Sequence, residues 1–199
     1  MSEASAEEFL GRVMPKVPEL SRDKFNFRSW RFENRPTSEG VGIRPGVSVD
    51  VEKMASRILD VEGYAENMKY VVDCTITSKN SDTDFVYIQR MNLPILGGLQ
   101  CALRMTDLGE RDGFRVVAWA QDDAVTDSLD KKKGGARTQY NLGAWLIRPD
   151  EIGYALSSAP RKSDVGSLKF AVMTKGANAG TSDMLKNNID TMIAWSKRD

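Results

Sequence analysis

Residues 181–198, with the sequence TSDMLKNNIDTMIAWSKR, decide the fold class of this chain. Their apolar side chains recur at helical spacing, which predicts an amphipathic helix that packs one side against the rest of the protein. Thr181 or Ser182 is placed to cap its first turn, and Lys197 and Arg198 lie in the last turn, where a cation suits the helix dipole. A weaker helical pattern over 165–174 precedes it, separated by the glycine-containing segment 176–180. The apolar positions of the closing helix are Met184, Leu185, Ile189, Met192, Ile193 and Trp195.

Upstream of this helix, the period of the apolar residues changes from 3.6 to 2 at about residue 69. Clusters of turn-forming residues divide the region into six candidate strands with short connections. Because no helix is expected between them, the strands form an antiparallel meander rather than parallel units. The candidate strands are 70–78, 84–93, 99–108, 114–121, 138–148 and 152–158.

Three elements are predicted before the meander: a helix over 5–14, an extended segment over 24–33 and a helix over 50–59 with Asp50 as its N-cap. The order predicts an α+β fold, a curved antiparallel sheet of about seven strands wrapped around the long C-terminal helix. We expect one domain over 1–199, with the N-terminal helix and first strand in 1–46 and the core in 47–199. A sheet wrapped around one helix seldom closes tightly on it, so we expect an internal cavity.

The composition is that of a globular protein with a real core, at 41% hydrophobic and 28% charged residues. The 28 basic and 28 acidic residues cancel, which argues against nucleic acids and strongly anionic membranes as partners. No stretch approaches the roughly 20 apolar residues that span a bilayer, and the acidic N-terminus is unlike a secretory signal. We therefore expect a cytoplasmic protein without integral membrane association.

The chain contains no histidine and two cysteines, Cys74 and Cys101. Serine and cysteine nucleophiles paired with histidine are thereby excluded, as are histidine-ligated metals. An all-cysteine zinc site needs four thiolates, so both cysteines are interpreted as small core residues. We assign no catalytic residue, no metal and no cofactor.

Several short motifs follow one another in an order that resembles the START-like (SRPBCC, polyketide cyclase-like) superfamily. They are DVEGYAENM at 60–68 after an amphipathic helix, NLP at 92–94, VVAW at 116–119 followed by Asp122-Asp123, the segment 140–145 before Arg148-Pro149, and the closing helix. The resemblance covers roughly 47–196, and the superfamily typically carries tryptophan where this chain has Met68. It implies a helix-grip fold enclosing an apolar tunnel, in which members bind sterols, phospholipids, plant hormones or polyketides. Some members, the aromatase/cyclases, guide ring closure in the same cavity.

Candidate ligand-binding residues lie on the predicted strands and the closing helix. Ligand sites are mostly apolar with a few placed polar groups, and methionine adapts to variable ligand shapes. These residues either line the cavity or pack against one another, because periodicity alone does not settle which strand faces point inward. They are Phe85, Tyr87, Gln89, Met91, Leu103, Met105, Trp119, Tyr140, Trp145, Tyr154, Met184 and Met192.

Arg90 and Arg104 lie within otherwise apolar strands. They either face solvent on the convex side or point inward to anchor a ligand carboxylate or phosphate through a bidentate pair.

Three segments are candidate lids over the tunnel mouth. The segment 122–135 is either a solvated loop or such a lid, and Gly97-Gly98 and 176–180 could serve equally as lids.

Three functions fit this sequence. The first is a non-catalytic carrier or sensor of a lipid, sterol, polyketide-like or other apolar small molecule. The second is a cyclase/aromatase-type enzyme, which would need an inward polar pair such as Arg90 with Tyr87 or Gln89. The third is an interaction module, which would have a collapsed interior and an exposed apolar patch.

Overall fold

The computed structural model describes residues 3–21, 24–94 and 97–198, with backbone alone for 3–5, 173 and 175–180. The first half of the chain forms α1 (Glu3–Val13), η1 (Met14–Lys16), β1 (Asn26–Trp30), β2 (Glu39–Pro45), α2 (Val51–Leu59), η2 (Val61–Gly63), α3 (Tyr64–Asn67), β3 (Val71–Ser81) and β4 (Asp84–Leu93). The second half forms β5 (Gly97–Arg111), β6 (Phe114–Gln121), α4 (Asp123–Ser128), α5 (Lys131–Gly134), β7 (Ala136–Arg148), β8 (Glu151–Pro160), α6 (Lys162–Val165) and α7 (Ser167–Ser196).

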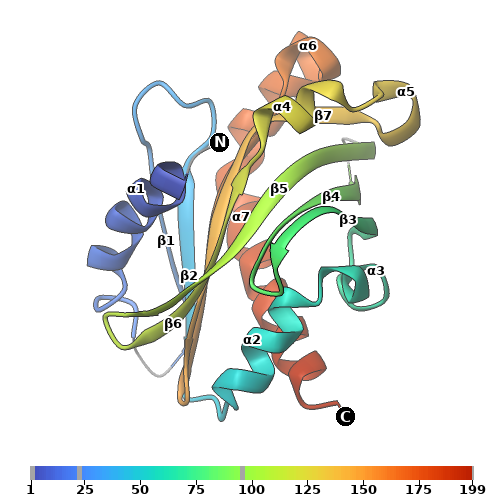
Figure 1. The fold of residues 1–199 in the computed structure, drawn as a ribbon. Coiled ribbons are helices and arrows are strands. Elements are labelled where there is room, and N and C mark those ends of the chain that lie inside the picture. Colours follow the sequence, from blue (N-terminus) through green and yellow to red (C-terminus); the bar gives the residue numbers. More distant parts are fainter. Residues whose placement is uncertain (1–2, 22–23, 95–96, 199) are drawn as a thin grey trace.

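The strands form one curved, unclosed sheet in the order β1-β2-β8-β7-β6-β5-β4-β3, in which all neighbours are antiparallel. A short parallel pairing of β5 with β7 joins Leu99 to Ala136. The sheet curves around α7, with α2 and α3 beside the C-terminal end of that helix (Figure 1). The predicted α+β architecture is confirmed.

The sheet has eight strands rather than the expected seven, because β2 forms within the turn-rich stretch after residue 36. Its alternation is hidden by Gly40 and Gly42, which leave two of the three inner-face positions of the strand without side chains. A Cβ at Gly42 would lie 2.8 Å from the ring of Phe25 and 3.4 Å from Leu185 of α7. Glycine is therefore required where an aromatic ring and the helix approach the strand backbone.

Helix α7 is longer than predicted and runs without a break from Ser167 through the segment 176–180 to Ser196. The predicted cap at Thr181 or Ser182 is wrong, because both residues lie inside the helix. Each glycine in a helix interior lowers the stability of the helix by about 1 kcal/mol relative to alanine. This loss is too small to interrupt a helix that continues on both sides of the glycine. Asp50, by contrast, caps α2 as predicted, and its side chain accepts the Lys53 N–H at 3.0 Å.

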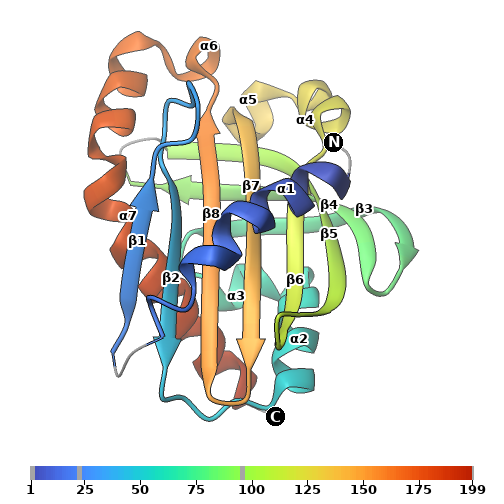
Figure 2. The same ribbon diagram turned by 90° about the vertical axis from the view of Figure 1, so that its left-hand side faces the viewer.

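The sheet buries apolar residues on both faces. We call the face toward α2, α3 and α7 the inner face and the opposite one the outer face. Helix α1 lies across the outer face over β6 and β7 (Figure 2). Phe9 and Val13 of α1 are fully buried there against residues of four strands: Val41, Ile43, Phe114, Val116, Leu142, Ala144, Leu146 and Ala155.

A buried carboxylate fixes the outer layer to the sheet. Glu39, at the start of β2, has no exposed side-chain surface and accepts hydrogen bonds from Arg12 of α1 at 2.8 and 3.0 Å. Arg35 donates to the same carboxylate at 3.2 Å, and Trp30 Nε1 donates at 2.9 Å. A buried charge is tolerated only with such pairing, so these groups depend on one another.

We expect Glu39→Gln to lower the free energy of unfolding by about 2–4 kcal/mol, because it leaves two partly buried guanidinium groups facing a neutral amide. Urea denaturation of the purified protein measures this change. Glu19→Gln is the matched control, since the Glu19–Arg28 pair is exposed and should contribute under about 1 kcal/mol. Equal effects of the two substitutions would contradict the prediction.

Candidate ligand-binding site

The register of β4 and β5 brings eight inner-face side chains together. Phe85 pairs with Met105, Tyr87 with Leu103, Gln89 with Cys101, and Met91 with Leu99. Side chains at every second position share a face, so both strands present one continuous row. Of these, Phe85, Tyr87, Cys101, Leu103 and Met105 belong to the inner core, and Met91 packs against it while remaining partly exposed.

Three aromatic side chains form the centre of the inner face. The ring of Tyr154 on β8 lies 4.3 Å from that of Trp145 and 5.4 Å from that of Trp119, measured between centroids. Trp119 lies directly over Gly143, its partner on β7, where any Cβ would overlap the ring. Trp119 Nε1 donates to Asn141 Oδ1 at 2.9 Å, so the indole is fixed on both its apolar and its polar side.

Helix α7 closes this face at its C-terminal end. Ile189 and Met192 are fully buried, and Trp195 stacks edge-on against Tyr64 at 6.0 Å. Asn188, one turn earlier, hydrogen-bonds the side chain of Tyr154. Met184 is only partly buried and does not join the inner core cluster.

Three of the candidate residues lie away from the others, on the outer face. Tyr140 forms a 2.6 Å hydrogen bond with Thr37, and Arg35 lies over its ring. Arg90 donates to Asp73 at 2.9 Å, and Arg104 forms a bidentate pair with Asp84 at 2.7 and 2.8 Å.

Alternation explains this placement, because each of the three residues is directly adjacent to an inner-face neighbour: Asn141, Gln89 and Leu103. The anchoring role proposed for the two arginines therefore has no support in their orientation. Asp73 and Asp84 already accept hydrogen bonds from the guanidinium groups that would otherwise be free to bind a ligand carboxylate or phosphate.

Cover of the inner face is uneven at the end of the molecule that carries α4, α5 and α6, uppermost in Figure 1: Leu99 is buried there, whereas Met91, its partner on β4, is partly exposed. Ile147 and Ile152, at the opposite end under α2 and α7, are at most 1% exposed. Farther up, some inner-face residues are covered only in part. Gln89, Met91, Tyr154 and Leu156 are partly exposed, and they adjoin buried residues of the same face. We call the whole set the inner patch: Tyr87, Gln89, Met91, Cys101, Trp119, Asn141, Tyr154 and Leu156.

Sequence reasoning missed Asn141, Leu156 and Asn188 as residues of this region. Leu156 and Asn141 alternate with residues that are equally apolar or polar, so periodicity gave no preference between the two faces. The alternation of Leu99, Cys101, Leu103 and Met105 does predict that these four residues share the apolar face of their strand.

Burial keeps the titratable groups of this region neutral. It raises the pKa of the Tyr87 and Tyr64 hydroxyls well above the usual value, and it raises the pKa of both Cys74 and Cys101 to about 12. The pKa of Tyr154 is raised as well, mainly by burial, although the hydrogen bond from Asn188 opposes the shift. None of these groups is poised to exchange a proton near neutral pH.

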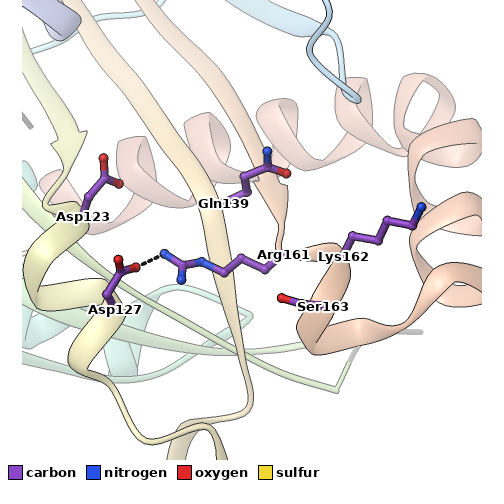
Figure 3. Close-up of a pocket in the computed structure, with 6 residues that line it drawn as sticks. All are labelled: Asp123, Asp127, Gln139, Arg161, Lys162 and Ser163. Carbon is purple, nitrogen blue, oxygen red and sulfur yellow. Dashed lines mark hydrogen bonds and ion pairs between the residues drawn. The ribbon is translucent and has the colours of Figure 1, made fainter.

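Two surface pockets lie elsewhere. The first, of about 430 Å³, is open and polar, and it is lined by Asp123, Asp127, Gln139, Arg161, Lys162 and Ser163 (Figure 3). Arg161 and Asp127 form an ion pair across it, so much of its charge is already satisfied. The second, also about 430 Å³, lies between α1 and the β5–β6 turn. Neither is between the sheet and α7, so the internal cavity stays a prediction.

The segment expected as a loop over 122–135 contains the short helices α4 and α5. Asp122 caps α4 by accepting the Val125 N–H at 3.0 Å, and Asp130 caps α5 by accepting the Lys132 N–H at 2.9 Å.

Within the described residues, no group of three cysteine, aspartate or glutamate side chains is arranged to hold a metal ion. No described helix is long and apolar enough to cross a membrane.

Comparison with known proteins identifies the fold. No family model and no curated protein sequence matches the chain. Among solved structures, a STAR-related lipid transfer protein from Xanthomonas axonopodis is 14% identical, with a TM-score of 0.69 over 89% of this chain and 96% of that one. Human StAR-related lipid transfer protein 5 is 12% identical, with a TM-score of 0.63 over 99% and 100%. The Zhui aromatase/cyclase from Streptomyces sp. R1128 is 13% identical, with a TM-score of 0.56 over 87% and 95%.

These likenesses confirm, at the level of fold, the START-like resemblance that the sequence motifs predicted. Lipid transfer proteins and aromatase/cyclases share this architecture, so the fold is compatible with more than one activity.

Gly143→Ala is expected to destabilise the protein by about 1–3 kcal/mol, because the added methyl group forces Trp119 off the β7 backbone. Thermal unfolding measures the loss, and near-ultraviolet circular dichroism reports the displaced indole. Gly11→Ala is the control, since nothing lies within 4 Å of a Cβ at that position on α1. An unchanged melting temperature for Gly143→Ala would show that Trp119 does not lie as described.

Stability should fall as the pH rises from about 9 toward 12. The thiols of Cys74 and Cys101 retain their protons in the folded state up to about pH 12, whereas unfolded thiols lose theirs near pH 9. The folded state therefore binds more protons in this window, and each thiol adds a slope of up to about 1.4 kcal/mol per pH unit. Urea denaturation at successive pH values should show a shallower slope for Cys101→Ala, and an unaltered slope would refute the assignment.

Proposed function

We propose that this START-like chain binds a lipid or another apolar small molecule between the inner face of the sheet and α7, as a carrier or sensor that performs no chemistry on it. The site is the inner patch together with the side of α7 that carries Asn188. A cytoplasmic location, as predicted from the sequence, suits such a carrier.

The unequal cover of the inner face carries this proposal. At its lower end, α2 and the C-terminal half of α7 bury Ile147 and Ile152 almost completely. Farther up, Met91 and Leu156 remain partly exposed although they lie on the concave side of the sheet. Because burial of apolar surface is favourable, an apolar ligand would bind to concave apolar surface that the protein itself leaves uncovered.

The N-terminal turns of α7 support the same interpretation. Leu168 is 81% exposed and Val172 is 49% exposed, so the helix leaves large apolar side chains in solvent instead of packing them on the sheet. This part of α7 lies at the upper end of the molecule, beside α6 (Figure 1). A ligand that enters there meets the less buried end of the inner patch.

The chemistry of the inner patch also suits binding. Aromatic and aliphatic side chains predominate, and amides and hydroxyls are few, as in most small-molecule sites. Among them, Asn141 is held by Trp119 and Tyr154 by Asn188. A cyclase-type reaction would require polar groups that converge on one reacting atom. Arg90, which was expected to join Tyr87 or Gln89 in such a group, is paired with Asp73 on the outer face, so we favour binding over catalysis.

Native mass spectrometry of freshly purified protein should show a bound molecule of defined mass, or occupancy after incubation with a panel of lipids, sterols and polyketide-like compounds. A protein that stays empty in both experiments would refute the proposal.

Leu156→Lys should weaken binding of any such ligand at least tenfold, because it places a charge within an apolar site. Val72→Lys is the matched control: Val72 on β3 is 60% exposed, so the same substitution there should change affinity by less than twofold. Titration of the tryptophan fluorescence of Trp119 and Trp145 measures both, and circular dichroism verifies that each variant is folded. Equal affinities for the two variants would place the ligand elsewhere.

A further inference from the structure

We infer that the ligand of the inner patch is electrically neutral and carries a hydroxyl or carbonyl group that hydrogen-bonds to Tyr87. This inference rests on the proposed function and narrows it to one chemical class. It separates neutral alcohols and ketones from fatty acids and from lipids that would bury a phosphate.

We infer that the ligand is neutral from the orientation of the charged side chains. All eight residues of the inner patch are uncharged types, whereas Arg90 of β4 and Arg104 of β5 extend from the opposite face. A bound carboxylate or phosphate would therefore lose its water without gaining a cation, which is strongly unfavourable.

Charged pairs occur only at the margins of this region among the described residues. Arg44 of β2 pairs with Asp190 of α7 at 3.2 Å, and both are more than a third exposed. Arg115 pairs with Asp107 at 2.7 Å near the end of the sheet and also contacts Glu52 of α2. Each cation already has a carboxylate partner, so neither is available to an anionic guest.

We infer that the ligand carries a hydroxyl or carbonyl group from the hydroxyl of Tyr87. Its side chain is 2% exposed, yet it forms no hydrogen bond with any described residue. The two other inner tyrosines do have partners: Tyr64 donates to the Ile58 carbonyl at 2.6 Å, and Tyr154 is bonded by Asn188. The Tyr87 hydroxyl is not one of the fully buried unpaired atoms of the described residues, so it keeps contact with accessible space. Hydroxyls of nearly buried side chains are usually paired in folded proteins, and we therefore place the ligand's polar group at this hydroxyl.

The environment of Tyr87 selects what that group can be. The titratable groups that raise the pKa of Tyr87, besides its burial, are Tyr64, Cys74, Cys101 and Tyr154, and all five groups stay neutral at physiological pH. The hydroxyl can donate to a carbonyl or exchange a hydrogen bond with an alcohol, but it cannot neutralise an anion. The expected ligand is thus an apolar skeleton with one or a few neutral oxygens.

Matched ligand pairs test the charge. Cholesterol is compared with cholesteryl sulfate, and 1-hexadecanol with hexadecanoate at pH 8, each by titration of tryptophan fluorescence. Within at least one pair, the neutral member should bind at least tenfold more tightly than its anion. Equal or tighter binding of the anion in every pair that binds would overturn the inference and leave the proposed function intact.

Tyr87→Phe tests the hydrogen bond. It should weaken binding of the neutral alcohol about fivefold and leave that of cholestane or hexadecane unchanged, because only the alcohol loses a partner. Tyr140→Phe removes an equivalent hydroxyl from the outer face and should change neither affinity. If Tyr87→Phe binds the alcohol as well as the parent protein, the assignment of Tyr87 is wrong. If the parent protein binds none of the compounds, the proposed function fails for these classes and this inference fails with it.

Discussion

The packing of Trp195 and Met192 against the turn after α2 is the contact on which the rest of the structure depends. A Cβ at Gly63 would lie 2.8 Å from the Trp195 ring, so the turn admits only glycine without rearrangement. Tyr64 meets the same ring edge-on and ties its own hydroxyl to the last turn of α2. This contact fixes the C-terminal end of α7 over the sheet. The helix is therefore anchored at its C-terminal end.

The outer layer makes this arrangement possible by removing the other apolar face of the sheet from water. Helix α1 buries Phe9 and Val13 against β6 and β7, and the carboxylate of Glu39 binds the helix to β2 through Arg12. Since the outer face is stabilised independently, the inner face need not be packed to capacity for the domain to fold. Incomplete packing of the inner face lowers the free energy of unfolding, but a domain of this size buries enough other apolar surface to remain folded.

Much of the fold follows from the sequence because its signals are local. The helical spacing of Ile189, Met192 and Trp195 and the alternation along 84–93 each predict an element without knowledge of its neighbours. β2 was missed since Gly40 and Gly42 remove the side chains on which alternation depends, and glycine was favoured there by contacts with distant residues.

The candidate site was harder to predict because it depends on which face of each strand turns inward. Tyr140 and Trp145 lie on the same strand and are equally suited to a ligand site, yet they face opposite sides. Which face of the strand is the inner one follows from the positions of α7 and α1. The sequence of a single strand does not contain this information. The degree of cover is harder still to predict, since Met91 is partly exposed although Leu99, its cross-strand partner on the same face, is buried.

The same alternation that concealed the site also determines its polarity. On β4, an inner row of Phe85, Tyr87 and Gln89 is interleaved with an outer row that includes Arg90, and Asp73 on β3 holds that arginine outside. An inward arginine would require a shift of one residue in register, which would also expose Phe85 and Tyr87 to solvent. The neutral character of the interior is therefore a consequence of the strand register and is maintained by the same burial that holds the sheet together.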